Sequence, residues 1–308
     1  MKIRLFDAHC DTAYELWRRR EALAGNSCHI DLAKTSELQS YAQFFAFCSY
    51  AGRDGEAQEL LRQPLAYLSE EVARNSERIA FADSPHAVTE LLAKGKIAAL
   101  LSVEGPEVID CDPDALEHLR EAGFLMTTLT WNADNPLAGA HGSDGGLTER
   151  GADFVREAQR LGMAIDVSHL SEAAFWDLIR MTQKPILASH SNCRALRDTT
   201  RNLTDDQLRA IADTDGAVGL NLYVPFLGQT ADFETLERHL ERMLRLCGER
   251  RVVLGGDLDG CDELPKGFTD LRGYPSFYAY LRGRGYDAAL LDRIFFENLL
   301  QLLQREVS

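Results

Sequence analysis

Residues 3–11 read Ile3-Arg4-Leu5-Phe6-Asp7-Ala8-His9-Cys10-Asp11, an apolar run that ends in a histidine and an aspartate. The same arrangement returns along the chain, where each further apolar run is followed by a residue type that binds metals. These residues are Glu104 after the run 97–103, His169 after 163–168, His190 after 185–189 and Asp257 after 251–256. Continuous apolar runs are typical of buried parallel strands, and β/α barrels carry their chemistry at the C-terminal strand ends. The positions therefore favour one shared site at the end of a barrel.

The rest of the chain supports this fold. Three further runs, at 41–50, 125–131 and 217–223, bring the expected strands to eight. Helical patterns lie between the strands, at 56–71, from Asp112 onward, and at 149–161, 171–182, 204–213 and 235–247. We expect an α/β fold, a (β/α)8 TIM-type barrel like those of metal-dependent hydrolases, as a single catalytic domain over 1–308. An open doubly wound sheet is the alternative, but no glycine-rich phosphate loop follows the first run.

Charge and composition limit the kinds of partner and the cellular compartment that we expect for this protein. A formal charge of −15 argues against nucleic acid or an anionic membrane as a partner. We find no apolar stretch long enough for a membrane helix, and residues 1–7 leave no room for a secretory signal. Seven cysteines, an odd number without a C-x-x-C pair, do not favour disulfides or a cysteine zinc site. We therefore expect a cytoplasmic protein.

The residues at the strand ends suggest a two-metal site. In a His-x-Asp pair both side chains leave a strand on the same side, so His9 and Asp11 can converge on one metal ion. Glu104 would be costly to bury unless it is paired or bound to metal, and its two oxygens can bridge two ions. His169 or His190 alone would more often be an ordinary core or surface histidine. Together, the five residues predict two ions that hold a hydroxide between them, as in peptide or ester hydrolysis.

Two further residues complete the expected chemistry. Asp257, in a glycine-rich segment beside the metals, is a candidate proton shuttle, and Asp259, two residues further on, is ranked second. Arg201 is a candidate clamp for a substrate carboxylate, although by itself it would be read as a surface arginine.

The chain resembles the membrane (renal) dipeptidase family of zinc metallopeptidases, as a microbial-type soluble member. The matching segments run in order through nearly the whole chain: 7–11 (DAHCD), 102–105 (SVEG), 127–132 (TTLTWN), 162–169 (GMAIDVSH), 188–192 (ASHSN), 201–206 (RNLTDD) and 256–260 (GDLDG). The resemblance implies a metallo-dipeptidase that cleaves small dipeptides, often with a C-terminal D-residue, and a homodimer.

Residue by residue, the resemblance also assigns the site. His9 and Asp11 bind one zinc, His169 and His190 bind the other, and Glu104 bridges the two zinc ions. Asp257 takes the acid/base role, Arg201 meets the substrate carboxylate, and Tyr223 lines the pocket.

One position departs from the family pattern. Animal members carry a histidine after Thr-Leu-Thr that stabilises the oxyanion, whereas this chain has Trp131 there, which we expect to line the substrate pocket. A tryptophan cannot replace that imidazole. We expect the nearby loop histidine His141 to reach the site in its place; a solvated loop histidine is the alternative.

Two other functions remain open from the sequence. The same metal site could act on another small amide, a lactone or a phosphoester, and the fold alone does not choose between these. A barrel that only binds a metabolite is the non-enzymatic alternative. It predicts the loss of at least one metal ligand, and all five positions are filled.

Overall fold

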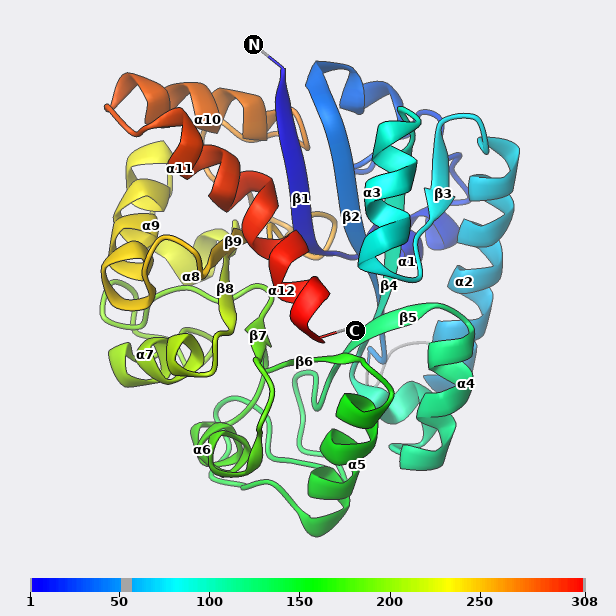
Figure 1. Ribbon diagram of the computed structural model, residues 1–308, viewed down its shortest axis with the longest axis vertical. Coiled ribbons are helices and arrows are strands. Elements are labelled where there is room, and N and C mark those ends of the chain that lie inside the picture. Colours follow the sequence, from blue (N-terminus) through cyan, green and yellow to red (C-terminus); the bar gives the residue numbers. More distant parts are fainter. Residues whose placement is uncertain (1, 51–56, 307–308) are drawn as a thin grey trace.

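The computed structural model describes residues 2–50 and 57–306, and within them eight parallel strands close into a barrel (Figure 1). Strand β1 pairs with β2 on one side and with β9 on the other, and β2 pairs directly with β4, which closes the ring. The barrel strands are β1 (Ile3–Cys10), β2 (Leu38–Cys48), β4 (Ile97–Glu104), β5 (Phe124–Thr128), β6 (Ala164–Asp166), β7 (Leu187–Ala188), β8 (Ala217–Leu220) and β9 (Val252–Leu254). The predicted TIM-type barrel is confirmed.

Each of the eight predicted strands is present, but two end three residues earlier than expected. Strand β5 stops at Thr128 and β8 stops at Leu220, so Trp131 and Tyr223 lie in the loops that follow rather than in strands. A short strand, β3 (Ile79–Phe81), was not predicted. It pairs along the first half of β4, while β5 pairs along the second half, so β3 lies outside the closed ring.

Helices connect the strands and cover the outside of the barrel (Figure 1). They are α1 (Thr12–Arg19), α2 (Ala57–Arg74), α3 (Pro85–Ala93), α4 (Leu116–Glu121), α5 (Glu149–Arg160), α6 (Glu172–Met181), α7 (Asp205–Asp213), α8 (Val224–Leu227), α9 (Phe233–Cys247), α10 (Gly273–Gly283), α11 (Ala288–Asp292) and α12 (Asn298–Glu306). The predicted helices are confirmed within a few residues; Glu56, expected to begin α2, lies outside the described residues. Thr204 and Gln207 form the predicted capping box of α7. From Asp112 the chain first makes a 3-10 turn, η3 (Pro113–Ala115), before α4.

The C-terminal segment closes one end of the barrel. The π-helical turn η4 (Arg293–Glu297) and α12 contribute Phe296, Leu299 and Leu302 to the same buried cluster as Phe6 and Leu100, which line the barrel interior. Figure 1 shows α12 lying across the barrel. Because apolar side chains fill this end, the polar residues gather at the other end, where the strands terminate.

Two expectations from composition can be compared with the structure. All seven cysteines are buried free thiols, as expected for a chain without a disulfide framework. In residues 2–50 and 57–306, no helix combines the length and the apolar character needed to cross a membrane.

Candidate metal centre and substrate cavity

A bulge in β1 turns His9 toward the inside of the barrel. Between Asp7 and Cys10 the register against β2 shifts, because β1 carries one extra residue there. Phe6, before the bulge, faces the barrel interior, whereas Cys10, beyond it, packs outward under the helices. β-Bulges often re-aim a side chain next to an active site. Here the extra residue brings His9 to the inner face.

The regular alternation of side chains along β4 turns Glu104 toward the barrel interior, as the bulge does for His9. Along β4, Ala98 and Leu100 face the barrel interior, while Ala99 and Leu101 pack outward. Side chains alternate along a strand, so Glu104, at the end of β4, again faces inward. It is only 2% exposed.

Two glycines make room for the backbone that leads into His190. A Cβ atom on Gly219 would lie 1.8 Å from the carbonyl oxygen of Ser189, and a Cβ on Gly255 would lie 1.7 Å from it. Any larger residue at either position would push this carbonyl away. The glycines at the ends of β8 and β9 therefore allow the chain before His190 to sit deep in the barrel.

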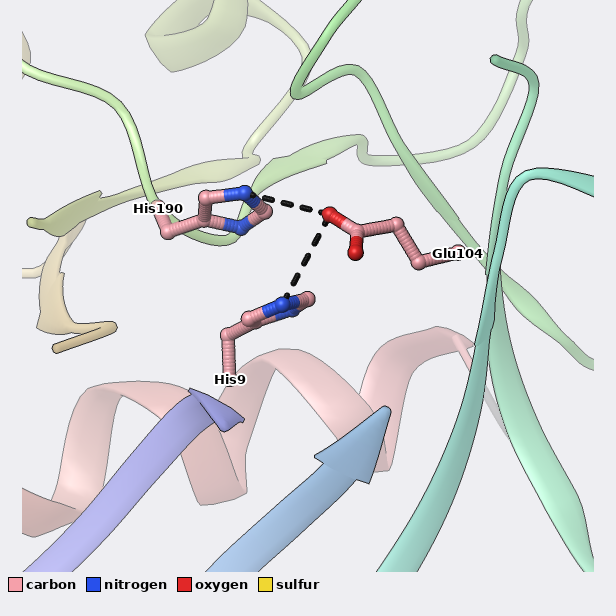
Figure 2. Close-up of side chains that lie close together, drawn as sticks. All are labelled: His9, Glu104 and His190. Atoms are coloured by element: carbon pink, nitrogen blue, oxygen red, sulfur yellow. Dashed lines mark ion pairs between the residues drawn. The ribbon is translucent and has the colours of Figure 1, made fainter. Parts of the chain in front are cut away.

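Three histidines surround one carboxylate oxygen. Glu104 Oε1 lies 2.9 Å from Nε2 of His169, 3.4 Å from Nε2 of His190 and 3.6 Å from Nε2 of His9. Figure 2 shows His9 and His190 pointing at this carboxylate from two sides. His9 Nε2 also lies 4.0 Å from Asp11 Oδ1. The structure thus brings all five predicted ligand residues together.

Hydrogen bonds on the far side of two rings fix which nitrogen carries the proton. His169 Nδ1 lies 2.9 Å from Oδ1 of Asn132, which can only accept, so Nδ1 is protonated and Nε2 carries a lone pair. His190 Nδ1 lies 2.7 Å from the hydroxyl oxygen of Ser189. Both ring nitrogens of His9, and Oδ1 of Asp11, are buried without a hydrogen-bond partner in the described residues. The partnerless atoms of His9 and Asp11 lie close together, where a cation would satisfy them.

The charge states suit such a cation. Burial lowers the pKa of His9 and of His169, so both rings are neutral and can act as ligands. Burial and the charge of Glu104 raise the pKa of Asp11 well above its ordinary range. A bound cation would offset this repulsion between carboxylates.

Asp257 joins the same cluster. Its Oδ1 lies 3.9 Å from Nε2 of His9, and its Oδ2 accepts a hydrogen bond from Asn221 at 3.3 Å. Burial raises the pKa of Asp257 to about 6. Two sets of side chains are close enough to hold an ion: His9, Glu104 and His190, and His9, Asp11 and Asp257. Asp259, ranked second in the sequence, is instead hydrogen-bonded to Thr12 and to the backbone N–H of His29 at 2.6 Å.

Arg201 reaches the centre from the loop after β7. Its side chain is only 5% exposed, and its Nη2 lies 3.0 Å from His169 Nε2. In the described part of the chain no carboxylate forms an ion pair with it, and its Nε has no hydrogen-bond partner. A buried guanidinium without an anion is costly, so the position favours an anionic ligand.

A cavity of about 650 Å³ opens above the cluster. Trp131 and Tyr223 both line it, as the sequence predicted, and Asp257 and Arg201 reach into it. Trp131 packs edge-on against Tyr50 with ring centres 5.4 Å apart, and the Tyr50 hydroxyl is hydrogen-bonded to Asp11. Trp131 and Tyr50 therefore form an aromatic wall of the cavity.

His141 also lies in the cavity, with its ring centre 6.0 Å from that of His169. Its Nε2 lies 3.0 Å from Oδ1 of Asn132, and its Nδ1 lies 3.0 Å from the Thr200 hydroxyl. Burial and then the charge of Arg201 lower its pKa to about 4, so the ring is neutral with a single N–H. Because Asn132 takes that N–H, the geometry favours a supporting role for His141 over the oxyanion contact expected from the sequence.

Several residues of the site were not singled out from the sequence, and Asn132, Asp166 and Ser189 are three of them. Each lies within one of the segments that match the family pattern in order. Each is also hydrogen-bonded to a predicted ligand or to the residue beside one. The available signal was a polar residue inside a matching segment, within three residues of a predicted site residue.

The comparisons with known proteins agree on one family. The model of the membrane dipeptidase family, peptidase family M19, matches residues 1–307. The chain is 34% identical over 264 residues to an uncharacterised protein in the pqqA 5′ region of Klebsiella pneumoniae, which covers 81% of this chain and 97% of that protein. It is 30% identical over 302 residues to an uncharacterised dipeptidase of Schizosaccharomyces pombe, which covers 88% of this chain and 73% of the relative.

Two solved structures share both the fold and recognisable sequence. A metallopeptidase from Rhodobacter sphaeroides, bound to a phosphinate mimic of the dipeptide L-Ala-D-Ala, matches with a TM-score of 0.92 at 29% identity, over 99% of this chain and 100% of that one. Dipeptidase AC, a metallopeptidase of family M19, matches with a TM-score of 0.93 at 29% identity, over 100% of this chain and 99% of that one.

Proposed function

The chain belongs to the membrane dipeptidase family, peptidase family M19, and on that basis we propose that it hydrolyses small dipeptides at a centre of two zinc ions. The observation that carries the proposal is the convergence of three Nε2 atoms on Glu104 Oε1 beside the buried Arg201. A metal centre next to a buried cation suits a substrate whose scissile carbonyl lies close to a free carboxylate. A dipeptide has this arrangement.

The ligand set divides into two halves that share one carboxylate. His9 and Asp11 would hold one zinc ion, His169 and His190 would hold the other, and Glu104 would bridge them. Neutral imidazoles and carboxylates are the usual zinc ligands of hydrolases. Two bound ions would supply Lewis-acid polarisation of the peptide carbonyl and lower the pKa of a water molecule.

The protein's own groups would do the rest. Asp257, next to His9, takes a proton from the attacking water and returns it to the leaving amine, which a carboxyl group with a pKa near 6 can do at neutral pH. Arg201 pairs with the C-terminal carboxylate of the substrate and fixes its register in the cavity. Burial of Arg201 makes this pairing stronger than it would be in water.

The cavity walls would select the side chains. Trp131 lines the cavity beside Tyr50, and Tyr223 packs edge-on against Phe226 with ring centres 4.8 Å apart. These aromatic walls suit small apolar side chains. The R. sphaeroides relative is bound to a mimic of L-Ala-D-Ala, which supports extending the proposal to dipeptides with a C-terminal D-residue.

Two expectations about the protein's surroundings also remain proposals. The seven free thiols support a reducing compartment such as the cytoplasm. A homodimer follows from the family resemblance, and the molar mass of the purified protein in solution tests it.

The direct test is hydrolysis of a matched dipeptide panel by the zinc-loaded protein. L-Ala-L-Ala, L-Ala-D-Ala, N-acetyl-L-Ala-D-Ala and L-Ala-D-Ala amide separate the need for a free amino terminus, the need for a free carboxyl terminus and the effect of configuration at the C-terminal residue. We expect hydrolysis of the free dipeptides and much slower hydrolysis of the amide. Failure on every free dipeptide, with zinc bound, would contradict the proposed substrate.

A further inference from the structure

Asp166 and Ser189 form a buried link behind His190. Asp166, at the end of β6, accepts hydrogen bonds from the backbone N–H groups of Ser168 and Ser189, each at 2.9 Å. The hydroxyl of Ser189 also donates to the Asp166 carboxylate. Asp166 and Ser189 are both fully buried, and His190 is only 1% exposed. The carboxylate therefore ties the ends of β6 and β7 together directly beneath the candidate metal centre.

The donor and acceptor roles in these hydrogen bonds follow from the carboxylate of Asp166. A carboxylate can only accept, so the single proton of the Ser189 hydroxyl points to Asp166. The hydroxyl oxygen must then accept from His190 Nδ1, which lies 2.7 Å away. The ring proton of His190 is therefore on Nδ1, and its Nε2 lone pair faces Glu104 Oε1 at 3.4 Å.

We propose that Asp166 and Ser189 are positioning residues that hold His190 in its metal-binding tautomer, through a relay from carboxylate to hydroxyl to imidazole. This inference rests on the proposed role of His190 as a zinc ligand. Metal-bound histidines usually donate their second ring N–H to a group that fixes the ring, and loss of that group typically lowers metal affinity by ~10–100-fold. His169 has its own partner, Asn132, so the relay acts on His190 alone.

Asp166→Asn should reverse the direction of the hydrogen bonds from Asp166 to His190 while it keeps the backbone hydrogen bonds to Oδ1. Asp166→Asn keeps Oδ1, so the backbone N–H groups of Ser168 and Ser189 keep their acceptor. However, the NH2 group of asparagine takes the place of Oδ2, so it donates a hydrogen bond to Ser189 where the carboxylate accepted one. Ser189 then accepts from the amide and gives its own proton to His190 Nδ1, which moves the ring proton to Nε2. His190 would then present an N–H to the metal position instead of a lone pair.

A second substitution breaks the relay, and a third serves as a matched control. Ser189→Ala removes the hydroxyl and leaves His190 Nδ1 without its acceptor. Ser102→Ala removes the hydroxyl of another buried serine, two residues before Glu104, whose oxygen has no hydrogen-bond partner among the described residues. The two serine variants thus differ in the relay and not in the type of change or in burial.

The experiment titrates the metal-free full-length variants with Zn²⁺ against a chromophoric chelator, after circular dichroism has confirmed their fold. In parallel, ¹⁵N NMR of labelled histidines identifies the His190 tautomer in the metal-free protein. We expect Nδ1–H in the wild type and in Ser102→Ala, and Nε2–H in Asp166→Asn. We expect Ser189→Ala and Asp166→Asn to bind one of the two ions ~10–100-fold more weakly than the wild type, and Ser102→Ala to bind both ions normally.

The outcomes separate this inference from the proposed function. A wild-type protein that binds no zinc would overturn both. A wild type that binds two ions, together with a folded Ser189→Ala variant of unchanged affinity, would overturn the relay alone. So would a wild-type His190 that carries its proton on Nε2.

Discussion

The Nε2 atoms of His169 and His190 lie 3.0 Å apart, and each Nδ1 atom lies within 2.9 Å of an oxygen that can accept its N–H. Two lone pairs therefore face each other, and Glu104 Oε1 lies within 3.4 Å of both. Arg201 Nη2, 3.0 Å from His169 Nε2, can donate to one of these three acceptors, and a cation between them would relieve the repulsion among all three. The fold maintains this arrangement through hydrogen bonds behind the rings, which indicates that the arrangement serves ion binding.

Glu104→Gln tests the shared carboxylate. An amide lacks the negative charge and has only one acceptor oxygen, so we expect weaker binding of both ions. The loss should exceed the ~10–100-fold that removal of a residue supporting a ligand costs. Zinc titration measures it, with Glu117→Gln on the exposed side of α4 as the control. Selective loss of one ion would mean that Glu104 is a ligand of that ion alone.

Asp257→Asn separates proton transfer from metal binding. Asp257 has a φ of 57°, a left-handed conformation that asparagine tolerates, so the variant should fold. We expect kcat to fall by ~10²–10⁴-fold, the usual contribution of a general acid or base, while zinc content stays at the wild-type level. Because Asp257 also lies near His9 and Asp11, zinc content must be measured on the same sample. A variant that loses an ion would reassign Asp257 as a metal ligand.

Arg201→Ala tests recognition of the substrate carboxylate. A hydrogen bond to a charged group contributes about 1.5–3 kcal/mol, so kcat/KM for free dipeptides should fall by ~10–100-fold. The same dipeptides with an amidated C-terminus should lose little, because they lack the carboxylate. Arg156→Ala, on the exposed face of α5, controls for the loss of a positive charge. Equal losses on both substrates would show that Arg201 acts through the structure of the site.

His141→Ala distinguishes support of His169 from contact with the substrate. If His141 holds Asn132 in place, the variant should lose about 10-fold or less in kcat/KM at saturating zinc, and more when zinc is limiting. A direct oxyanion donor would instead cost ~10²–10³-fold in kcat at any zinc concentration. Activity assays across a zinc series decide between the two, with the exposed His118→Ala as the control.

The sequence was sufficient to predict the barrel and to place the candidate ligand residues near one another, because both depend on local pattern. A buried parallel strand needs a continuous apolar run, and the residue that ends the run faces the open end of the barrel. This reasoning brought Glu104 and His190 to the same end of the barrel, where the structure places them 3.4 Å apart. It did not reveal the bulge in β1, which decides that His9 points inward.

Features that depend on contacts between distant segments could not be read from the sequence. Trp131 and Tyr223 extend apolar runs but lie beyond the ends of their strands. The hydrogen bonds of Asn132 to His169 and of Ser189 to Asp166 depend on the path of the loops and on the pairing of β6 with β7. His141 was correctly expected near the site, but its partners, Asn132 and Thr200, appear only in the folded chain.

The most direct test of the two-zinc dipeptidase is the number of ions that restore activity. The metal-free protein is titrated with Zn²⁺, and bound metal and hydrolysis of L-Ala-D-Ala are measured on the same samples. We predict that two ions bind per chain and that activity is complete only when both sites are filled. Binding of a single ion with full activity, or binding of two ions without hydrolysis of any dipeptide, would contradict the account.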